Sequence, residues 1–107
     1  MKDVLLGTQE PVKVSVDAIG TITMADMDFT IKYFSKVYGY AVTVPKSECV
    51  KVDENTYEIV VDTQRIGEGM LNVIVDLAIP YGNAPSGLIK KLLYLPSNIR
   101  IVSPSEL

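Results

Sequence analysis

The stretch from Leu71 to Ile79 constrains the fold more than any other part of this sequence, because its residues alternate at the period of a β-strand. Its apolar positions fall on one face, namely Leu71, Val73, Val75, Leu77 and Ile79. The opposite face is mixed and carries Asn72, Ile74, Asp76 and Ala78. Successive side chains of a strand point to opposite sides of a sheet, so we predict a long strand with one face in the core.

A glycine-bounded turn precedes this strand. Gly67 and Gly69 flank Glu68, and glycine adopts left-handed backbone conformations at little cost. Asp62 or Thr63 is expected to cap a single helical turn that Gly67 ends. A phosphate-binding loop is not indicated, because the Lys-Ser/Thr pair of such loops is missing and a strand follows in place of a helix.

Shorter β-rich runs flank the long strand on both sides. The predicted strands cover residues 12–16, 29–34, 40–44, 49–52, 57–61 and 99–102. Turn or loop composition separates them at 18–23, 35–39, 53–55 and 80–87. The 35–39 segment has the length of a hairpin connection, and acidic and amide side chains at 53–55 can satisfy local backbone groups.

The segment Leu88–Leu95 fits two different elements. Leu88, Ile89, Leu92 and Leu93 have helical spacing, with Lys90 and Lys91 on the other side. Eight residues without an obvious cap make a marginal helix, however, and the flanking context is β. We therefore predict a strand with two partly covered faces, and keep an amphipathic helix as the alternative.

These elements predict an all-β fold, an antiparallel immunoglobulin-like β-sandwich of seven or eight short strands. A small closed barrel is the alternative. Residues 1–10 are expected to form an N-terminal arm, 11–102 a single sandwich domain and 103–107 a flexible tail. The cysteine pair and tryptophan of antibody domains are missing, since the chain has one Cys and no Trp.

Composition narrows the possible functions. The net charge of −3 lacks the concentrated positive charge that nucleic-acid binding requires. A single cysteine, Cys49, excludes an intrachain disulfide and is expected to be a small buried residue on a strand. No signal peptide or membrane span is expected from MKDVLLGTQEP. The hydrophobic fraction of 48% implies either a generous core or apolar surface that a partner covers.

No catalytic, cofactor or metal site is predicted. The chain has no histidine, which removes a common metal ligand and general base. Asp26 and Asp28 resemble a fragment of a calcium loop, but the distal acidic ligand and the glycine of that motif are missing. Asp53 and Glu54 are an equally weak calcium site. Paired carboxylates could also act as the acid and base of a glycoside hydrolase, but no platform for stacking a sugar accompanies them. We therefore expect these acids to be solvated loop residues.

Two groups of residues are candidates for partner binding. Val4, Leu5 and Leu6 precede a glycine hinge, and one hypothesis is that this arm is a strand donated to a neighbouring subunit. Tyr38, Tyr40 and Tyr81 lie in a predicted hairpin and loop, where aromatic rings often anchor partners. The alternative for the tyrosines is that their rings cover the sandwich edge.

Five segments carry a family resemblance: 57–63 (YEIVVDT), 66–71 (IGEGML), 79–80 (IP), 85–87 (PSG) and 99–102 (IRIV). This pattern, over residues 26–102, resembles small virion proteins of tailed bacteriophages and prophages of Bacteroides-type hosts. It is also similar in outline to the immunoglobulin-like N-terminal domains of phage baseplate upper proteins. The 80–87 loop departs from the family pattern, which has acidic residues there.

The resemblance implies a non-enzymatic virion subunit, assembled in the host bacterial cytoplasm, that decorates a capsid, anchors a head fibre or adapts a tail or baseplate. Its partners would be capsid, fibre or tail subunits, with self-association left open. No cofactor, nucleic acid or membrane partner is expected. The alternative function is a carbohydrate-binding or adhesin module that uses the loop tyrosines.

Overall fold

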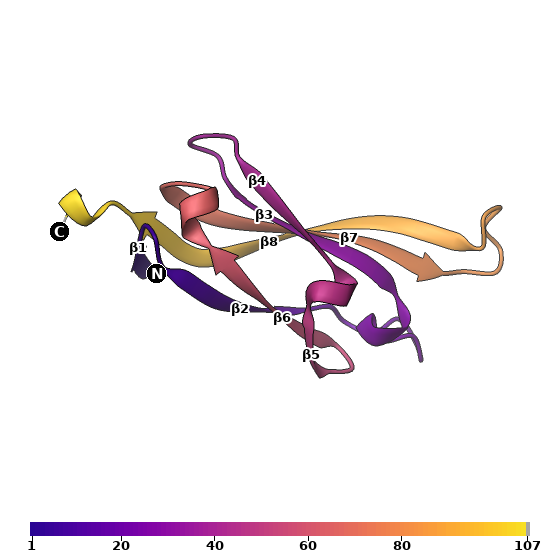
Figure 1. The fold of residues 1–107 in the computed structure, drawn as a ribbon. Coiled ribbons are helices and arrows are strands. Elements are labelled where there is room, and N and C mark those ends of the chain that lie inside the picture. Colours follow the sequence, from indigo (N-terminus) through magenta and orange to yellow (C-terminus); the bar gives the residue numbers. More distant parts are fainter. Residues whose placement is uncertain (107) are drawn as a thin grey trace.

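The long strand predicted from the alternation is β7 (Gly69–Pro80), which forms a hairpin with β8 (Leu88–Val102) in a computed structural model that describes residues 1–106 (Figure 1). Three other strands complete this sheet: β1 (Lys2–Leu5), β3 (Asp28–Ser35) and β4 (Ala41–Pro45). The strand order is β1-β8-β7-β3-β4. β7 is therefore the central strand of the large sheet.

A second sheet of three strands packs against the first. It has the order β2-β6-β5, built from β2 (Gln9–Ser15), β6 (Thr56–Asp62) and β5 (Val50–Asp53). The remaining elements are 3₁₀ turns: η1 (Met24–Asp26), η2 (Lys46–Glu48), η3 (Thr63–Arg65) and η4 (Pro104–Glu106). Within residues 1–106 no helix is long and apolar enough to cross a membrane.

The topology confirms the predicted antiparallel immunoglobulin-like β-sandwich. Strands 2, 6 and 5 make one sheet, and strands 3, 7 and 8 lie in the other, as the corresponding strands of immunoglobulin domains do. The one parallel pair joins β1 to the end of β8. Every other strand pair is antiparallel.

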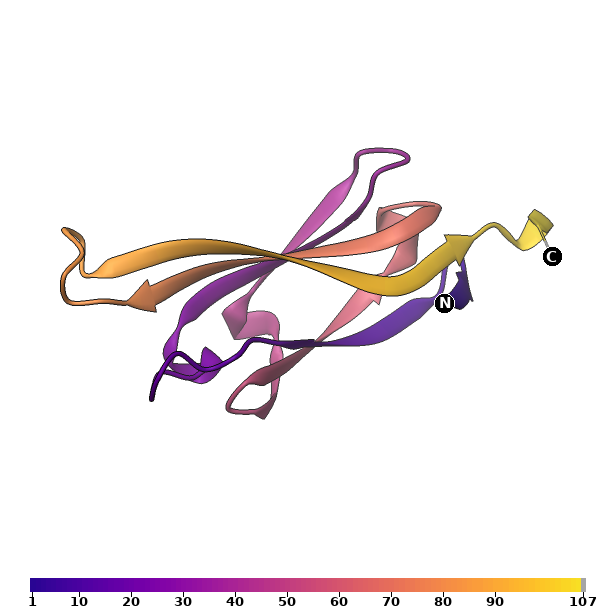
Figure 2. The same cartoon turned by 180° about the vertical axis from the view of Figure 1, so that it is seen from behind.

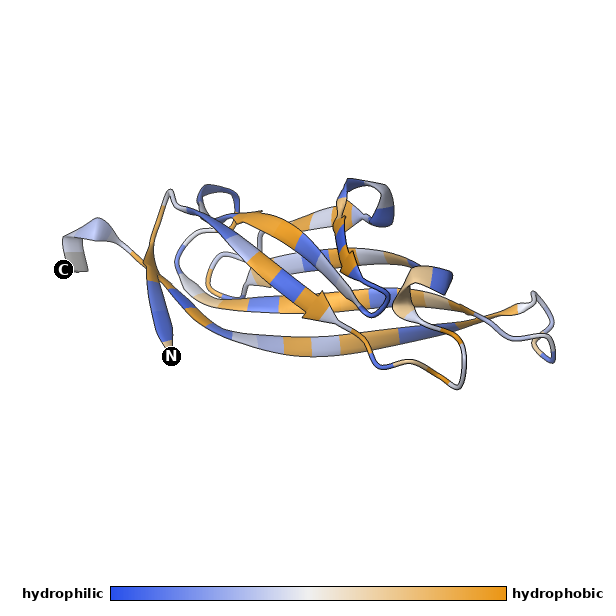
Figure 3. Ribbon diagram, turned by 90° about the horizontal axis from the view of Figure 1, so that it is seen from below, coloured by the Kyte–Doolittle hydropathy of each residue, from blue (hydrophilic) through white to orange (hydrophobic). Residues whose placement is uncertain are grey.

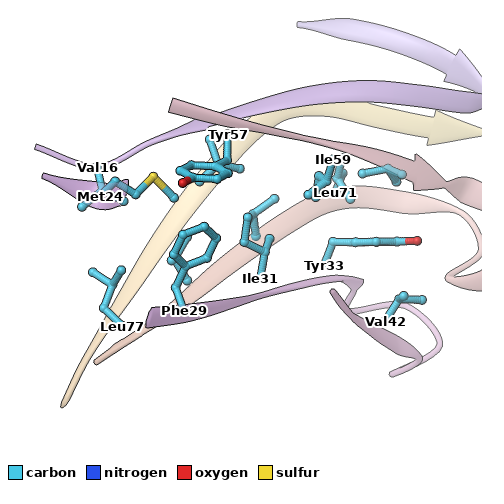
Figure 4. Packing of buried hydrophobic residues seen from close by; sticks show 14 of the residues in the cluster. Val16, Met24, Phe29, Ile31, Tyr33, Val42, Tyr57, Ile59, Leu71 and Leu77 are labelled. Atoms are coloured by element: carbon cyan, nitrogen blue, oxygen red, sulfur yellow. The ribbon is translucent and has the colours of Figure 1, made fainter. Parts of the chain in front are cut away.

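The core lies between the two sheets, as Figure 4 shows. The apolar face of β7 is buried along its whole length, with exposed fractions from 0 to 3% at Leu71, Val73, Val75, Leu77 and Ile79. Hydrophobic and polar residues alternate along the strands (Figure 3). Phe29 of β3 meets Tyr57 of β6 edge to face, with ring centroids 4.9 Å apart. Burial of alternate side chains thus fixes the register of both sheets.

The segment 88–95 is a strand, as predicted, and it continues through the predicted 99–102 strand to form the 15-residue β8. A bulge interrupts this strand. Met70 pairs with Arg100 but Asn72 pairs with Pro96, so β8 carries extra residues between those positions. Asn98 there has a φ of 57°, and the Ser97 hydroxyl donates to the Leu71 carbonyl at 2.6 Å.

The N-terminal residues differ from the predicted arm, because they belong to the sandwich. Residues 2–5 form β1 on the edge of the large sheet, and β2 begins at Gln9 within the predicted arm. The buried Thr63 ties this segment to the turn after β6. Its hydroxyl accepts from Gly7 N–H at 2.9 Å and donates to the Thr8 carbonyl at 2.8 Å. Of the predicted 103–107 tail, Pro104–Glu106 form η4, and Leu107 lies outside the described residues.

The predicted helical turn is η3. Asp62 caps it, since its carboxylate accepts from Gln64 N–H at 3.1 Å. Gly67 follows with a φ of 82°, and its N–H donates to the Thr63 carbonyl. The turn therefore connects β6 of the small sheet to the start of β7 in the large sheet.

Candidate functional site

The apolar residues of the N-terminal segment lie largely within the molecule. Val4 is buried in the core, Leu6 packs partly against it, and Leu5 is 39% exposed. β1 pairs with β8 of the same chain, with Val4 opposite Ile101. Val4 and Leu6 thus contribute to the fold, and Leu5 is the member of this group that remains accessible.

Tyr38 and Tyr40 form an exposed aromatic pair on the β3–β4 turn. Their rings stack with centroids 6.5 Å apart and an interplanar angle of 19°. Their exposed fractions are 52% and 64%. Tyr38 also packs on the backbone of Gly67, where an added Cβ would lie 2.4 Å from the ring. This contact holds the first ring in place and leaves the second open to solvent.

Tyr81 lies far from this pair, at the tip of the β7–β8 hairpin. Its N–H donates to the Gly87 carbonyl and its carbonyl accepts from Ala84 N–H, so the loop is closed by its own backbone. The 12 residues of β7 separate the tip from the Tyr38 end of the sheet. At ~3.3 Å per residue this separation is roughly 40 Å. The structure therefore does not bring the three predicted tyrosines together.

A group of apolar side chains lies on the side of the five-stranded sheet that faces away from the small sheet, where polar residues such as Asn72, Asp76 and Lys90 lie between them. We call it the outer patch and define it by five residues on β3, β7 and β8: Phe34, Ile74, Leu88, Leu92 and Tyr94. The exposed fractions on β8 are high, at 65% for Leu92, 55% for Tyr94 and 49% for Leu88. Large apolar side chains gathered on one face are typical of an interaction surface.

Polar groups hold the outer patch in position. The Tyr94 hydroxyl donates to the Asn72 side-chain oxygen, and the Asn72 amide in turn donates to the Met70 carbonyl at 3.0 Å. Lys36 lies 5.9 Å from the centre of the Tyr94 ring. A half-open hollow of about 400 Å³ lies beside this ring, with Pro96 in its wall. The patch is therefore an ordered surface with a defined depression.

Lysines lie between and beside the apolar side chains of the patch. Lys32 lies 5.8 Å from the centre of the Phe34 ring. Lys90 pairs with Asp76 at 3.5 Å, and both groups are substantially exposed. Sequence reasoning did not single out this surface. The strand interpretation of 88–95 could have found it, because it places Leu88, Lys90, Leu92 and Tyr94 on one face.

The acidic residues considered as metal or catalytic groups serve local structure. The Asp26 carboxylate accepts from the backbone N–H and the hydroxyl of Thr23, and these hydrogen bonds lower its pKa. Asp28 accepts from Phe29 N–H, and Asp53 accepts from Asn55 N–H. No group of three or more His, Cys, Asp or Glu residues that could hold a metal ion occurs within residues 1–106.

Cys49 differs from its prediction as a buried strand residue. It is half-buried and lies between η2 and β5, where its thiol donates to the Pro45 carbonyl at 3.4 Å. Burial, together with the nearby charge of Glu48, raises the pKa of the thiol. A raised pKa reduces the thiolate fraction and hence the nucleophilicity at neutral pH.

Comparisons of the chain with protein-family models, with curated proteins and with solved structures find no match. No relative or structural neighbour thus assigns a role to the outer patch or to the tyrosine pair.

Proposed function

We propose that this chain is a non-enzymatic structural subunit of a tailed-phage virion, which acts through protein–protein contacts as a capsid decoration, a head-fibre anchor or a tail or baseplate adapter. The sequence resemblance over residues 26–102 supports the virion part of the proposal. The outer patch supports the part that concerns protein contacts, and it is the observation that carries the proposal. Assembly would take place in the cytoplasm of the bacterial host.

The outer patch suits a protein partner better than a small ligand. Its residues are spread over three neighbouring strands of a sheet, and only one of them, Tyr94, lines the hollow beside it. Small-molecule sites are usually concave and enclose most of their ligand. Protein interfaces instead combine an apolar, aromatic centre with a polar rim. Leu92 and Tyr94 supply such a centre, and Lys32, Lys36 and Lys90 supply positive charge near it, two of them between apolar side chains of the patch.

The elongated shape also suits an adapter. The molecule measures 53 × 26 × 22 Å, and the β7–β8 hairpin projects past the small sheet in Figures 1 and 2. Its tip and its Tyr38–Tyr40 end can thus contact different neighbours. Repeated copies on a particle would turn weak individual contacts into stable attachment through a high effective concentration.

The proposal predicts that the chain is present in purified phage particles from a lysogen or infected culture that carries its gene. Mass spectrometry of particles banded on a density gradient is expected to detect its peptides in constant ratio to the major capsid protein. A host-derived cytoplasmic protein of similar size is the control and should be lost during banding. Particles without the chain would contradict the proposal.

A carbohydrate-binding module is the second candidate, and the stacked pair of Tyr38 and Tyr40 favours it. Exposed aromatic faces are apolar platforms with a polar rim, on which a flat ligand such as a sugar ring can lie. A glycan array decides between the two candidates. Saturable binding that is lost in Tyr38→Ala or Tyr40→Ala would favour the carbohydrate module over the virion subunit.

A further inference from the structure

Most of β8 has a free edge. β1 pairs only with its last residues, Ile99–Val102, and lies beside only this end in Figure 1. The bulge at Ser97–Asn98 separates that paired end from the rest of the strand. Within residues 1–106 no strand pairs with the edge of β8 from Leu88 to Pro96. Unpaired backbone groups on such an edge are a template for another strand.

The pairing of β7 with β8 determines which residues of β8 direct their backbone N–H and C=O groups to the free edge. Tyr81 N–H donates to the Gly87 carbonyl, so these opposed residues form a hydrogen-bonded pair. Hydrogen-bonded and non-hydrogen-bonded pairs alternate along an antiparallel ladder. The backbone groups of Leu88, Lys90, Leu92 and Tyr94 therefore point to the free edge. Pro96 has the same phase and offers its carbonyl alone.

We infer that a second copy of this chain pairs antiparallel along this edge, about a two-fold axis at Leu92, so that the two large sheets become continuous. The axis places Leu92 opposite Leu92 of the second copy. On the same face, Lys90 lies opposite Tyr94 and Leu88 opposite Pro96. These residues all present backbone groups to the partner, so the hydrogen-bonding phase of the two strands agrees.

Side-chain pairing on the other face agrees with this register. Ile89 meets Leu95, and Lys91 meets Leu93, so apolar side chains lie together and the lysine stem covers a leucine. No lysine lies directly opposite another lysine, which would be destabilising. The ammonium group of Lys90 meets an aromatic ring, an attractive arrangement, and retains Asp76 as its ion-pair partner.

Other two-fold registers fit less well. An axis at Lys90 sets two lysines directly against each other. An axis at Tyr94 places Lys90 opposite the bulged Asn98, which is out of the ladder. An axis at Lys91 also sets two lysines directly against each other. An axis at Leu93 places Leu88 opposite the bulged Asn98. The Leu92 axis is the one that uses the whole edge from Leu88 to Pro96.

The lysines and Pro96 are features that often discourage edge pairing. They favour the register centred on Leu92 over other registers of the two β8 strands, because in it each of them lies opposite a compatible side chain. The interface is small, so we expect a dissociation constant of about 1–100 μM. Self-pairing concerns the chain alone and does not rest on the virion proposal, so either can fail without the other.

Sedimentation equilibrium of the purified chain tests the dimer. We expect a monomer–dimer equilibrium, and Leu92→Lys and Leu92→Asp are each expected to raise the dissociation constant by about tenfold by placing like charges on the axis. An equimolar mixture of the two variants should recover the dimer, because Lys and Asp then face each other. Val60→Lys, on the outer side of the small sheet, is the control and should leave dimerisation unchanged. A monomer at every concentration up to the solubility limit would overturn the inference.

Cross-linking tests the register, in a Cys49→Ser background. Leu92→Cys is expected to link efficiently with a short bifunctional thiol reagent, since opposed residues have Cα atoms about 5.5 Å apart. Tyr94→Cys should not link to itself, because its counterpart lies about 14 Å along the strand. A mixture of Lys90→Cys and Tyr94→Cys should link. Equal linking of the Leu92→Cys and Tyr94→Cys variants alone would overturn the Leu92 axis.

Discussion

Ile31→Ala is expected to lower the free energy of unfolding by about 2–5 kcal/mol. Ile31 is fully buried on β3, where it lies opposite Val75 of β7 on one side and Val44 of β4 on the other. Truncation removes apolar contacts and leaves a cavity that two neighbouring strands prevent from collapsing. Urea unfolding followed by circular dichroism measures the change, with a lower midpoint and an unchanged slope.

Val60→Ala is the matched control for this substitution. Val60 is also a strand residue, but its side chain is 57% exposed on β6. A surface change of this kind is expected to alter stability by no more than about 0.5 kcal/mol. Equal losses for the two variants would show that the core does not lie between these sheets.

Gly69→Ala is expected to cost about 2–4 kcal/mol, because two effects add at this position. Gly69 has a φ of 116°, a backbone conformation that residues with a Cβ rarely adopt. An added Cβ would also lie 2.5 Å from Ser35 Oγ and 2.7 Å from Val37 Cγ2. The Ser35 hydroxyl cannot move away freely, since it is buried and donates to the Glu68 carbonyl.

Alanine substitutions at two other glycines distinguish the cost of a positive φ from the cost of a steric clash. Gly39 has a φ of 72° but nothing within 4 Å of an added Cβ, so Gly39→Ala should show backbone strain alone, about 1–2 kcal/mol. Gly82 has neither a positive φ nor a close neighbour, and Gly82→Ala should be nearly neutral. Urea midpoints of the three variants are expected in the order Gly82→Ala, Gly39→Ala, Gly69→Ala, from highest to lowest. Another order would contradict the close approach of β3 to the start of β7.

The fold could be predicted because burial acts on alternate residues. The period-two pattern at Leu71–Ile79 identified the central strand, and turn residues at regular intervals identified its neighbours. The extent of β8 was not predictable in this way. Pro96 and Asn98 indicate a break, yet the strand passes through them as a bulge held by the Ser97 hydroxyl.

The N-terminal segment shows a second limit of sequence reasoning. The apolar run Val4-Leu5-Leu6 is too short for its sequence to indicate which strand it pairs with. Its partner is the far end of β8, and a parallel pairing across the whole chain has no turn motif that would predict it. The outer patch illustrates a third limit of sequence reasoning. The outer patch combines residues that are distant in sequence, such as Phe34, Ile74 and Tyr94, and they come to lie on one face only when β3, β7 and β8 pair.

Cosedimentation of the chain with purified phage particles tests the central claim, that the chain is a virion subunit attached through the outer patch. The double variant Phe34→Ser/Ile74→Ser changes the patch without touching the edge of β8. The control Val52→Ser/Val60→Ser changes two exposed residues of the small sheet. Circular dichroism would first establish that both variants are folded. We predict that the wild type and the control cosediment equally and that the patch variant is depleted about tenfold, the effect expected when apolar contacts of an interface are lost. Absence of the wild type from the particles, or equal recovery of both variants, would contradict this claim.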